Sequence, residues 1–132
     1  MKFHHIGLVV SDLSKSSKIL KSDFKIINTS KIYTDKKIEV KLRFFDLNNN
    51  TKLELIQPLN NKSPIKRFLD KKNTSTIHHL AYTCKDIDKT CNNFRKKGYG
   101  FLTNFFHAEA FNGSRVIFLL SPLNFIVELI EN

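Results

Sequence analysis

The sequence resembles itself at an offset of 74 residues (78 − 4 = 74), and this repeat constrains the fold more than any other feature. The segment HHIGLVVSDLSKS, which begins at His4, lies over HHLAYTCKDIDKT, which begins at His78. Downstream the register returns without a gap, because LELI from Leu53 lies over VELI from Val127. Such a repeat predicts two copies of one supersecondary unit.

Each half predicts the same series of elements, βαβββ. An alternating apolar strand comes first, and polar residues suited to a helix N-terminus follow it, Ser11-Asp12 in one half and Lys85-Asp86 in the other. A helix with one apolar stripe comes next, and short strands complete the half. The predicted strands span residues 3–10, 24–28, 38–47 and 52–56, then 77–84, 100–104, 114–120 and 125–130.

The length of 132 residues predicts one domain, which suffices for a core shared by two modules. Module 1 is expected over about residues 1–60 and module 2 over about 76–132. Between them, the segment of about 61–75 is expected to form a short linker helix, because Ser63-Pro64 places a proline in its first turn.

Composition excludes several classes of protein. No apolar stretch approaches the roughly 20 residues that cross a bilayer, and the N-terminal segment has no signal or transit character, so a cytoplasmic protein without a membrane partner is expected. Cys84 and Cys91 form no C-x-x-C motif, which argues for buried or half-buried thiols and against a disulfide scaffold or a zinc knuckle.

The formal charge of +10 does not by itself indicate nucleic-acid binding. The lysines are scattered as pairs, such as Lys36-Lys37, Lys71-Lys72 and Lys96-Lys97, and form no single basic arm. A solvated surface is the simpler interpretation, and a basic rim would also attract an anionic substrate. No nucleic-acid partner is expected.

Two histidines and two glutamates occupy equivalent places in the repeat. The separation is 49 residues in both halves, from His5 to Glu54 and from His79 to Glu128 (54 − 5 = 128 − 79 = 49). Both glutamates lie among apolar strand residues, where an ionised carboxylate needs a partner. Two imidazoles and two carboxylates supply ligands for one divalent cation, Zn²⁺, Ni²⁺, Co²⁺, Fe²⁺ or Mn²⁺.

Simpler readings apply to any one of these residues alone. A strand histidine is usually hydrogen-bonded and structural, and a strand carboxylate usually faces solvent. Adjacent strand residues point to opposite faces, so only one histidine of each HH pair can face the interior. His4 and His78 are interpreted as the outward-facing neighbours and His107 as a loop residue, while Asp12 and Asp86 are interpreted as helix caps.

A doubled βαβββ unit with histidine on the first strand and glutamate on the last resembles the vicinal-oxygen-chelate (glyoxalase-like) superfamily over nearly the whole chain. Within it the chain is most similar to the methylmalonyl-CoA epimerases. The segments that carry this similarity are HHIGLVVSDL, LELIQPLNNKSPIKRFLDKK, IHHLAYTCKDID and VELIE. The resemblance implies an α+β fold in which the two modules form a cupped, eight-stranded mixed sheet around a metal site.

The resemblance also implies roles for residues. His5, His79 and Glu128 match metal ligands, and Glu54 lies where these epimerases carry a glutamine or glutamate ligand. The implied reaction removes the proton α to a carbonyl or thioester and returns it to the other face, with Glu128 as acid and base. The implied partner is a small carbonyl or acyl-thioester substrate, and homodimers are usual in the superfamily.

The chain departs from the epimerase pattern in three places. A second catalytic glutamate, present in one type of epimerase, is replaced by Leu42, and Glu39 is the nearest carboxylate; Glu54 is an alternative second base. The His-Pro-Lys stretch before the last strand is shortened to residues 120–124. The glycine-rich loop before the penultimate strand is reduced to residues 111–114.

Other functions within the superfamily stay open at this point. Glyoxalase I, a lactoylglutathione lyase, uses a His/Glu/His/Glu ligand set in its bacterial form, although this chain lacks its aromatic segment after the first helix. An extradiol dioxygenase would need only two histidines and one glutamate on Fe²⁺. A drug-binding resistance protein usually loses the ligands, which this chain keeps.

Overall fold

The computed structural model describes residues 1–72 and 76–132, and the chain forms two compact units within them. The first unit contains residues 5–78, and the second contains residues 1–4 and 79–132. Strand β1 (Lys2–Val9) contributes its start to the second unit and its remainder to the first. The end of the predicted linker, residues 73–75, lies outside the described residues.

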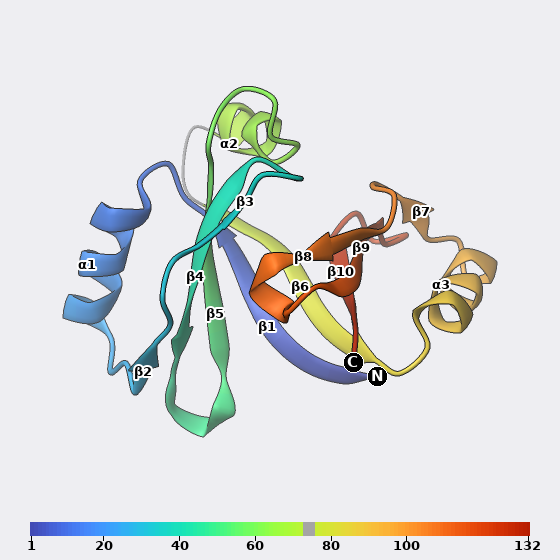
Figure 1. Cartoon of the computed structure of the whole chain (residues 1–132), viewed down its shortest axis with the longest axis horizontal. Coiled ribbons are helices and arrows are strands. Elements are labelled where there is room, and N and C mark those ends of the chain that lie inside the picture. The colour runs from blue at the N-terminus through green and yellow to red at the C-terminus, as the bar shows by residue number, and fades with distance from the viewer. Residues whose placement is uncertain (73–75) are drawn as a thin grey trace. The chain divides into compact units, whose positions relative to one another are not determined.

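The first unit contains a five-stranded sheet built on strand β5 (Lys52–Pro58). Strand β1 runs parallel to β5, and β4 (Val40–Asp46) runs antiparallel to it on the other side. Two short strands, β2 (Asn28–Thr29) and β3 (Tyr33–Asp35), both pair antiparallel with β4 (Figure 1). A 3-10 turn, η1 (Asn48–Asn50), joins β4 to β5.

Helix α1 (Leu13–Asp23) covers one face of this sheet. It begins where the sequence predicts, because the Asp12 side chain accepts a hydrogen bond from the Lys15 N–H at 2.9 Å. Leu13 and Leu20 are buried against Phe45 and Leu55 from β4 and β5. These strand residues alternate with others that point to the opposite face, so that face is left for the functional side chains.

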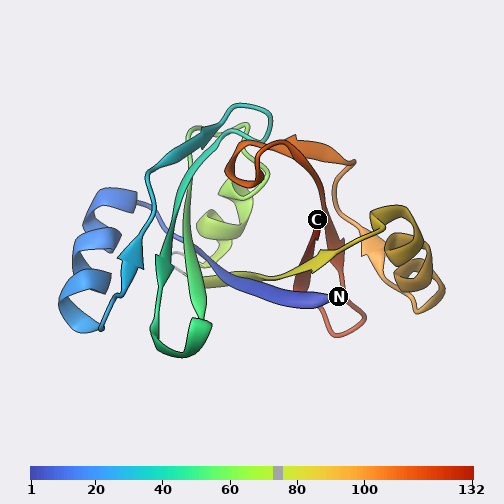
Figure 2. The ribbon, with the colours of Figure 1, turned by 60° about the horizontal axis from the view of Figure 1, so that its bottom comes forward.

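The second unit repeats this arrangement. Strand β10 (Ile126–Glu131) runs parallel to β6 (Thr76–Cys84) and antiparallel to β9 (Ser114–Leu120), and the short strands β7 (Gly100–Phe101) and β8 (Phe106–Ala108) pair with β9. Helix α3 (Ile87–Lys96), drawn in tan in Figures 1 and 2, packs on one face through Ile87 and Cys91. Asp86 caps it as Asp12 caps α1, accepting from the Lys89 N–H at 2.8 Å. A 3-10 turn, η2 (Glu109–Phe111), precedes β9.

Ten strands are present among the described residues, where the sequence predicts eight. In each unit two short strands stand where the sequence predicts one, β2 with β3 and β7 with β8, and both β3 and β8 lie outside the predicted ranges. The predicted strand over residues 24–28 is wrong except at its last residue. Phe24 ends the helix by donating to the Leu20 carbonyl, and Ile27 is 63% exposed, so this segment has no sheet face to bury.

The linker helix starts later than the sequence predicts. Residues Ser63 and Pro64 form a turn, in which the Lys66 N–H donates to the Ser63 carbonyl, and α2 (Lys66–Lys72) follows. The Ser63 hydroxyl donates to the Ile38 carbonyl at 3.1 Å, and this bond attaches the turn to the loop between β3 and β4. Helices beside antiparallel and parallel strands confirm the predicted α+β class. In the described ranges, no helix is both long and apolar enough to span a membrane.

Candidate metal centre

The first unit buries one histidine and one glutamate together. Glu54 is on β5, opposite Gly7 in the parallel register with β1, and His5 lies two residues before Gly7 on the same face. His5 is 0% exposed and Glu54 is 2% exposed. Nε2 of His5 lies 3.6 Å from Oε2 of Glu54.

The second unit contains the equivalent pair. His79 on β6 is 1% exposed and Glu128 on β10 is 4% exposed. Nε2 of His79 lies 3.6 Å from Oε2 of Glu128, the same pair of atoms and the same separation as in the first unit. The sequence repeat is therefore matched in the structure. Each unit contains one half-site, His5 with Glu54 in the first and His79 with Glu128 in the second, and the two have the same geometry.

The 3.6 Å separation suits two ligands of one cation better than a hydrogen bond. A nitrogen and an oxygen that share a proton lie about 2.7–3.2 Å apart. Two ligand atoms each about 2.0–2.2 Å from a divalent ion lie roughly 3–3.5 Å from one another. Imidazole with carboxylate is also a donor set that Zn²⁺, Co²⁺, Ni²⁺, Fe²⁺ and Mn²⁺ accept. Each half-site therefore fits the metal-ligand role that the sequence predicts for it.

A phenylalanine completes each half-site, and neither one is among the residues that the sequence predicts for the site. Phe44 lies opposite Glu54 in the β4–β5 register, and its ring stands edge-to-face on His5 with centroids 5.3 Å apart. Phe118 lies opposite Glu128, and its ring makes the same contact with His79 at 5.3 Å. Their positions differ by the repeat offset (118 − 44 = 74), so following the repeat into these strands would have found them.

The remaining histidines lie away from these pairs. His4 and His78 are half-buried, and each contacts an aromatic ring of its own unit, Phe111 for His4 and Phe68 for His78. His107 is predicted as a loop residue, but it is an exposed residue of β8 whose Nδ1 lies 2.7 Å from the Gly113 carbonyl oxygen. Strand alternation explains why the neighbours of His5 and His79 face elsewhere.

The structure rules out Glu39 as a buried second base. Glu39 lies in the turn before β4 with a φ of 52°, and its carboxylate accepts from the exposed Asn60 amide at 3.0 Å. Leu42 is 5% exposed on β4, opposite Ile56, and points to the same face as Phe44 and Glu54. An apolar side chain therefore occupies this place beside the first half-site.

The shortened loop before β10 is a tight turn. Ser121 accepts from the Asn124 N–H through its carbonyl and from the Leu123 N–H through its hydroxyl. Asn124 has a φ of 62°, a left-handed conformation that asparagine tolerates. The turn leaves Leu123 82% exposed, so this chain has a compact, apolar-tipped turn at the end of β9.

Titratable groups elsewhere in the second unit are shifted by burial or by pairing. Burial raises the pKa of the Cys84 thiol, and it raises the pKa of Cys91 to about 11, as expected for buried free cysteines. Arg115 donates to both oxygens of Glu131 and to Asp88, at 2.7–2.9 Å. This guanidinium lowers the pKa of Glu131, and the two carboxylates raise the pKa of Arg115.

Comparison with known proteins gives the same family as the motifs do. Residues 4–118 match the Glyoxalase/Bleomycin resistance protein/Dioxygenase superfamily. The mitochondrial methylmalonyl-CoA epimerase of Mus musculus is 30% identical over 118 residues, which is 89% of this chain and 65% of that protein. An ethylmalonyl-CoA/methylmalonyl-CoA epimerase of Cereibacter sphaeroides is 34% identical over 80 residues, 51% of this chain and 60% of that protein.

Solved structures with these names share the fold. Methylmalonyl-CoA epimerase from Mycobacterium tuberculosis superposes with a TM-score of 0.82 at 23% identity, over 98% of this chain and 87% of that one. The chain spans just under two thirds of the length of the mouse relative and 87% of the length of the Mycobacterium tuberculosis structure. The match over residues 4–118 and the two modules with their buried histidines place this chain in the Glyoxalase/Bleomycin resistance protein/Dioxygenase superfamily.

Proposed function

We propose that the chain is a metal-dependent epimerase that moves the proton α to the carbonyl of an acyl-CoA thioester. The observation that carries the proposal is the pair of equivalent half-sites, each a buried histidine 3.6 Å from a buried glutamate. The names of the mouse and Cereibacter sphaeroides relatives support the substrate class, methylmalonyl-CoA or a neighbouring branched malonyl thioester.

The metal centre in this proposal is one cation held by His5, Glu54, His79 and Glu128. The two modules then act as a single domain, because neither half-site alone offers more than one imidazole and one carboxylate. A bound divalent cation would supply Lewis-acid stabilisation of the negative charge that develops on the thioester oxygen. Co²⁺, Ni²⁺, Zn²⁺, Mn²⁺ and Fe²⁺ all accept such a ligand set.

In this proposal, two carboxylates of the chain carry out the proton transfers. Glu128 takes the α proton on one face, and Glu54 is the candidate donor on the other face. Each carboxylate is buried beside a phenylalanine, Phe118 for Glu128 and Phe44 for Glu54, and a desolvated carboxylate accepts a proton from carbon more readily than a hydrated one. His5 and His79 lie 3.6 Å from these carboxylates as the other two ligands of the proposed centre.

Leu42 sets an expectation about stereochemistry. Because a leucine side chain carries no proton, the first half-site depends on Glu54 alone for the second face. Exchange of the α proton with solvent is therefore expected to run faster than inversion of the centre. Replacing Leu42 by glutamate is expected to raise the ratio of inversion to exchange.

A second candidate is an isomerase of the glyoxalase I type, a lactoylglutathione lyase. The observation that favours it is that both half-sites carry a carboxylate, so the set is His/Glu/His/Glu without an amide ligand. The two chemistries share proton transfer beside a carbonyl, so the substrate distinguishes them. In either case we expect a homodimer in the cytoplasm, with no nucleic-acid partner.

The test is deuterium incorporation from D₂O into (2R)- and (2S)-methylmalonyl-CoA, followed by NMR with protein reconstituted with each metal in turn. We expect exchange with slower inversion, lost at least about a hundred-fold in Glu128→Gln, as for removal of a general base. Glu131→Gln, a substitution of the same kind on the same strand but outside the half-site, is the matched control and should retain exchange.

The outcomes separate the candidates. Absence of exchange with every metal would reject the epimerase proposal. Turnover of the methylglyoxal–glutathione hemithioacetal by the same preparation would then assign the glyoxalase I type. Exchange that persists in Glu128→Gln would move the acid–base role to another residue.

A further inference from the structure

Glu128 has four neighbours on the half-site face of the second unit, and only one of them is not buried. Ala81 on β6 and Phe118 on β9 lie on either side of it in the strand registers, and Ile126 and Ile130 lie two residues away on β10. Ala81, Phe118 and Ile130 are buried, whereas Ile126 is half-buried. Along this sheet face, a group attached to a carbon beside the Glu128 carboxylate therefore has room only over Ile126.

The side of Glu128 toward Ile130 is closed by packing within the same unit. Ile130 and Val116 belong to a buried core cluster, and the rings of Phe106 and Phe111 pack against this cluster. Protein interiors are close-packed, so a substituent could enter there only by displacing these side chains. The other side, toward Ile126, is the side left for the substrate.

This open side is apolar. Ile126 lies beside His79 in the parallel register with β6 and opposite Leu120 in the antiparallel register with β9. Both Ile126 and Leu120 are half-buried, so they present apolar surface next to the half-site. The turn from β9 to β10 adds Leu123 and Phe125, which are exposed. Such a surface favours contact with an alkyl group over contact with water.

The first unit has an ion pair in the equivalent place. At the positions 74 residues earlier, Leu120 and Ile126 are replaced by Asp46 and Lys52, which face one another in the same antiparallel register. The Lys52 ammonium lies 2.8 Å from the Asp46 carboxylate. The βαβββ framework thus accepts either a charged or an apolar pair here, so the fold itself does not require the apolar pair of the second unit.

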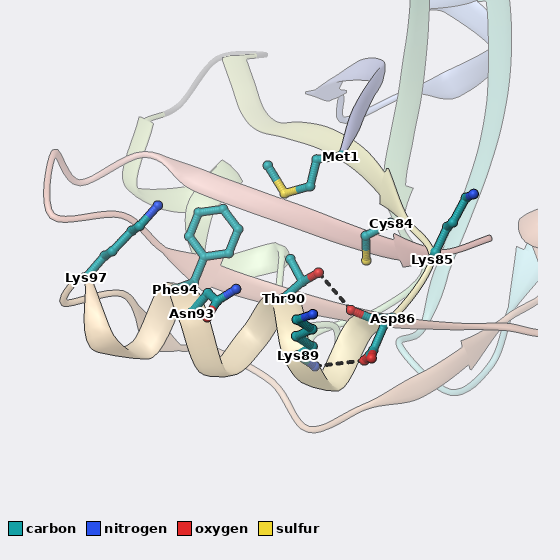
Figure 3. A pocket seen from close by; sticks show the side chains of 9 residues that line it. All are labelled: Met1, Cys84, Lys85, Asp86, Lys89, Thr90, Asn93, Phe94 and Lys97. Carbon is teal, nitrogen blue, oxygen red and sulfur yellow. Dashed lines mark hydrogen bonds between the residues drawn. The ribbon is translucent and has the colours of Figure 1, made fainter.

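The pocket on the helix side of the same sheet is no alternative place for an alkyl group beside Glu128. Cys84 lines this pocket together with Lys85 and Lys97, which lie before and after α3 (Figure 3). Cys84 points to the opposite face of β6 from His79, because the two differ by an odd number of residues. The sheet therefore separates this pocket from Glu128.

We propose that Ile126 and Leu120 determine substrate specificity by binding the alkyl substituent on the α carbon, and that the substrate is an alkylmalonyl thioester with a chain longer than methyl. The inference rests on the proposed function, because it takes Glu128 as the group that removes the α proton. The chain runs from that carbon over Ile126 toward Leu120, on strands about 4.8 Å apart. Complete burial of one methylene strengthens binding about four-fold, which corresponds to about 0.8 kcal/mol.

The test is a calorimetric measurement of Kd for methylmalonyl-, ethylmalonyl- and butylmalonyl-CoA with the metal-reconstituted full chain. We expect binding to strengthen at least about two-fold for each added methylene, about half of the free energy that complete burial gives. Leu120→Asp/Ile126→Lys, which places the ion pair of the first unit in the second, should remove this dependence on chain length. The matched control, Asp46→Leu/Lys52→Ile, makes the reverse exchange in the first unit and should keep the dependence.

Ile126→Thr tests the same surface with a smaller change, in case the double exchange unfolds the chain. Threonine keeps the β-branched shape that suits a strand and adds a hydroxyl. The dependence of Kd on chain length should therefore fall in this variant, while its far-ultraviolet circular dichroism matches that of the wild type.

Two results would overturn the inference. One is a Kd that does not depend on chain length in the wild type, and the other is a dependence that the control exchange removes as fully as the exchange in the second unit. Exchange of the α proton in D₂O, followed with the same three thioesters, tests the proposed function separately. Exchange without a dependence of Kd on chain length rejects the specificity role alone. A dependence without exchange rejects the epimerase reaction and retains the apolar surface as the binding site of the alkyl chain.

Discussion

Each half-site places a carboxylate where burial is costly. Removing an ionised group from water costs several kcal/mol, so a glutamate that is 2% or 4% exposed has to be matched by positive charge or a cation. A histidine 3.6 Å away matches it only when protonated, whereas a divalent cation matches it with the histidine neutral. The residues are thus arranged for binding at some expense of stability.

Another charged residue, Glu131, lies next to the second half-site in sequence but has a structural role. Arg115 lowers the pKa of Glu131 below its ordinary value of 4.5, and the Ile87 N–H adds a hydrogen bond at the start of α3. A carboxyl with a lowered folded-state pKa contributes stability above its unfolded pKa and loses it as the pH falls through the folded value. Glu131→Gln should therefore destabilise the chain most near neutral pH.

The measurement is urea unfolding of the wild type and Glu131→Gln between pH 7 and pH 3. The difference in unfolding free energy is expected to shrink steadily below about pH 4.5. Asp23→Asn, which removes an exposed carboxylate of α1 that makes none of these bonds, is the control. A difference that stays constant or grows on acidification would contradict the role assigned to Arg115.

The sequence predicts the two histidine–glutamate pairs but not the side chains that surround them. Strand alternation says that one histidine of each HH pair faces inward but does not say which, and the structure buries His5 and His79. Phe44 and Phe118, whose rings contact these histidines, were not among the residues predicted for the site. Their contact with the histidines depends on strand pairing between β4 and β5 and between β9 and β10, which sequence periodicity does not give.

At the scale of elements, the helix starts illustrate how the repeat builds each unit. Besides the Asp12 and Asp86 caps, the last strand of each unit supplies an acceptor to the first helical N–H. The Gln57 side chain accepts from the Leu13 N–H at 2.7 Å, and Glu131 accepts from the Ile87 N–H. These strand–helix bonds fix each helix on the sheet face opposite its half-site.

The Asp12 cap gives a prediction for helix α1. Asp12→Ala leaves the Lys15 N–H without its side-chain acceptor, and the unfolding free energy should fall by about 1 kcal/mol. Asp12→Ser should recover most of the loss, because serine also caps well. Equilibrium unfolding in urea measures both. Equal losses in the alanine and serine variants would show that the aspartate acts otherwise than as a cap.

Elements with a buried face were predictable, and those without one were not. The long strands and helices α1 and α3 follow the apolar alternation and the caps. The short strands β3 and β8 escaped prediction because each has only three residues and pairs with a single neighbour. The start of α2 was misplaced because Ser63 is bonded to Ile38, a contact distant in the sequence.

At the scale of the whole molecule, the unbroken register of the repeat carried the most information. It predicted that Glu54 and Glu128 would stand in the same relation to His5 and His79, and both pairs have a 3.6 Å separation. Departures from the repeat were equally informative, because Lys85 and Lys97 of the second unit correspond to Ser11 and Asp23 in the first. The two modules thus have equivalent half-sites but differ in the charge of their surfaces.

The number of metal ions bound per chain tests whether the two half-sites act as one. If one cation is shared by four ligands, calorimetric titration with Co²⁺ or Mn²⁺ gives one ion per chain, and His5→Gln and His79→Gln each abolish tight binding. At a hundred-fold excess over Kd the ion should add about 2.7 kcal/mol to the unfolding free energy. His78→Gln, next to His79 but on the other face of β6, is the matched control and should bind normally. Two ions per chain, with one retained in each single variant, would instead mean that each half-site binds its own cation, and a four-ligand centre would then be rejected.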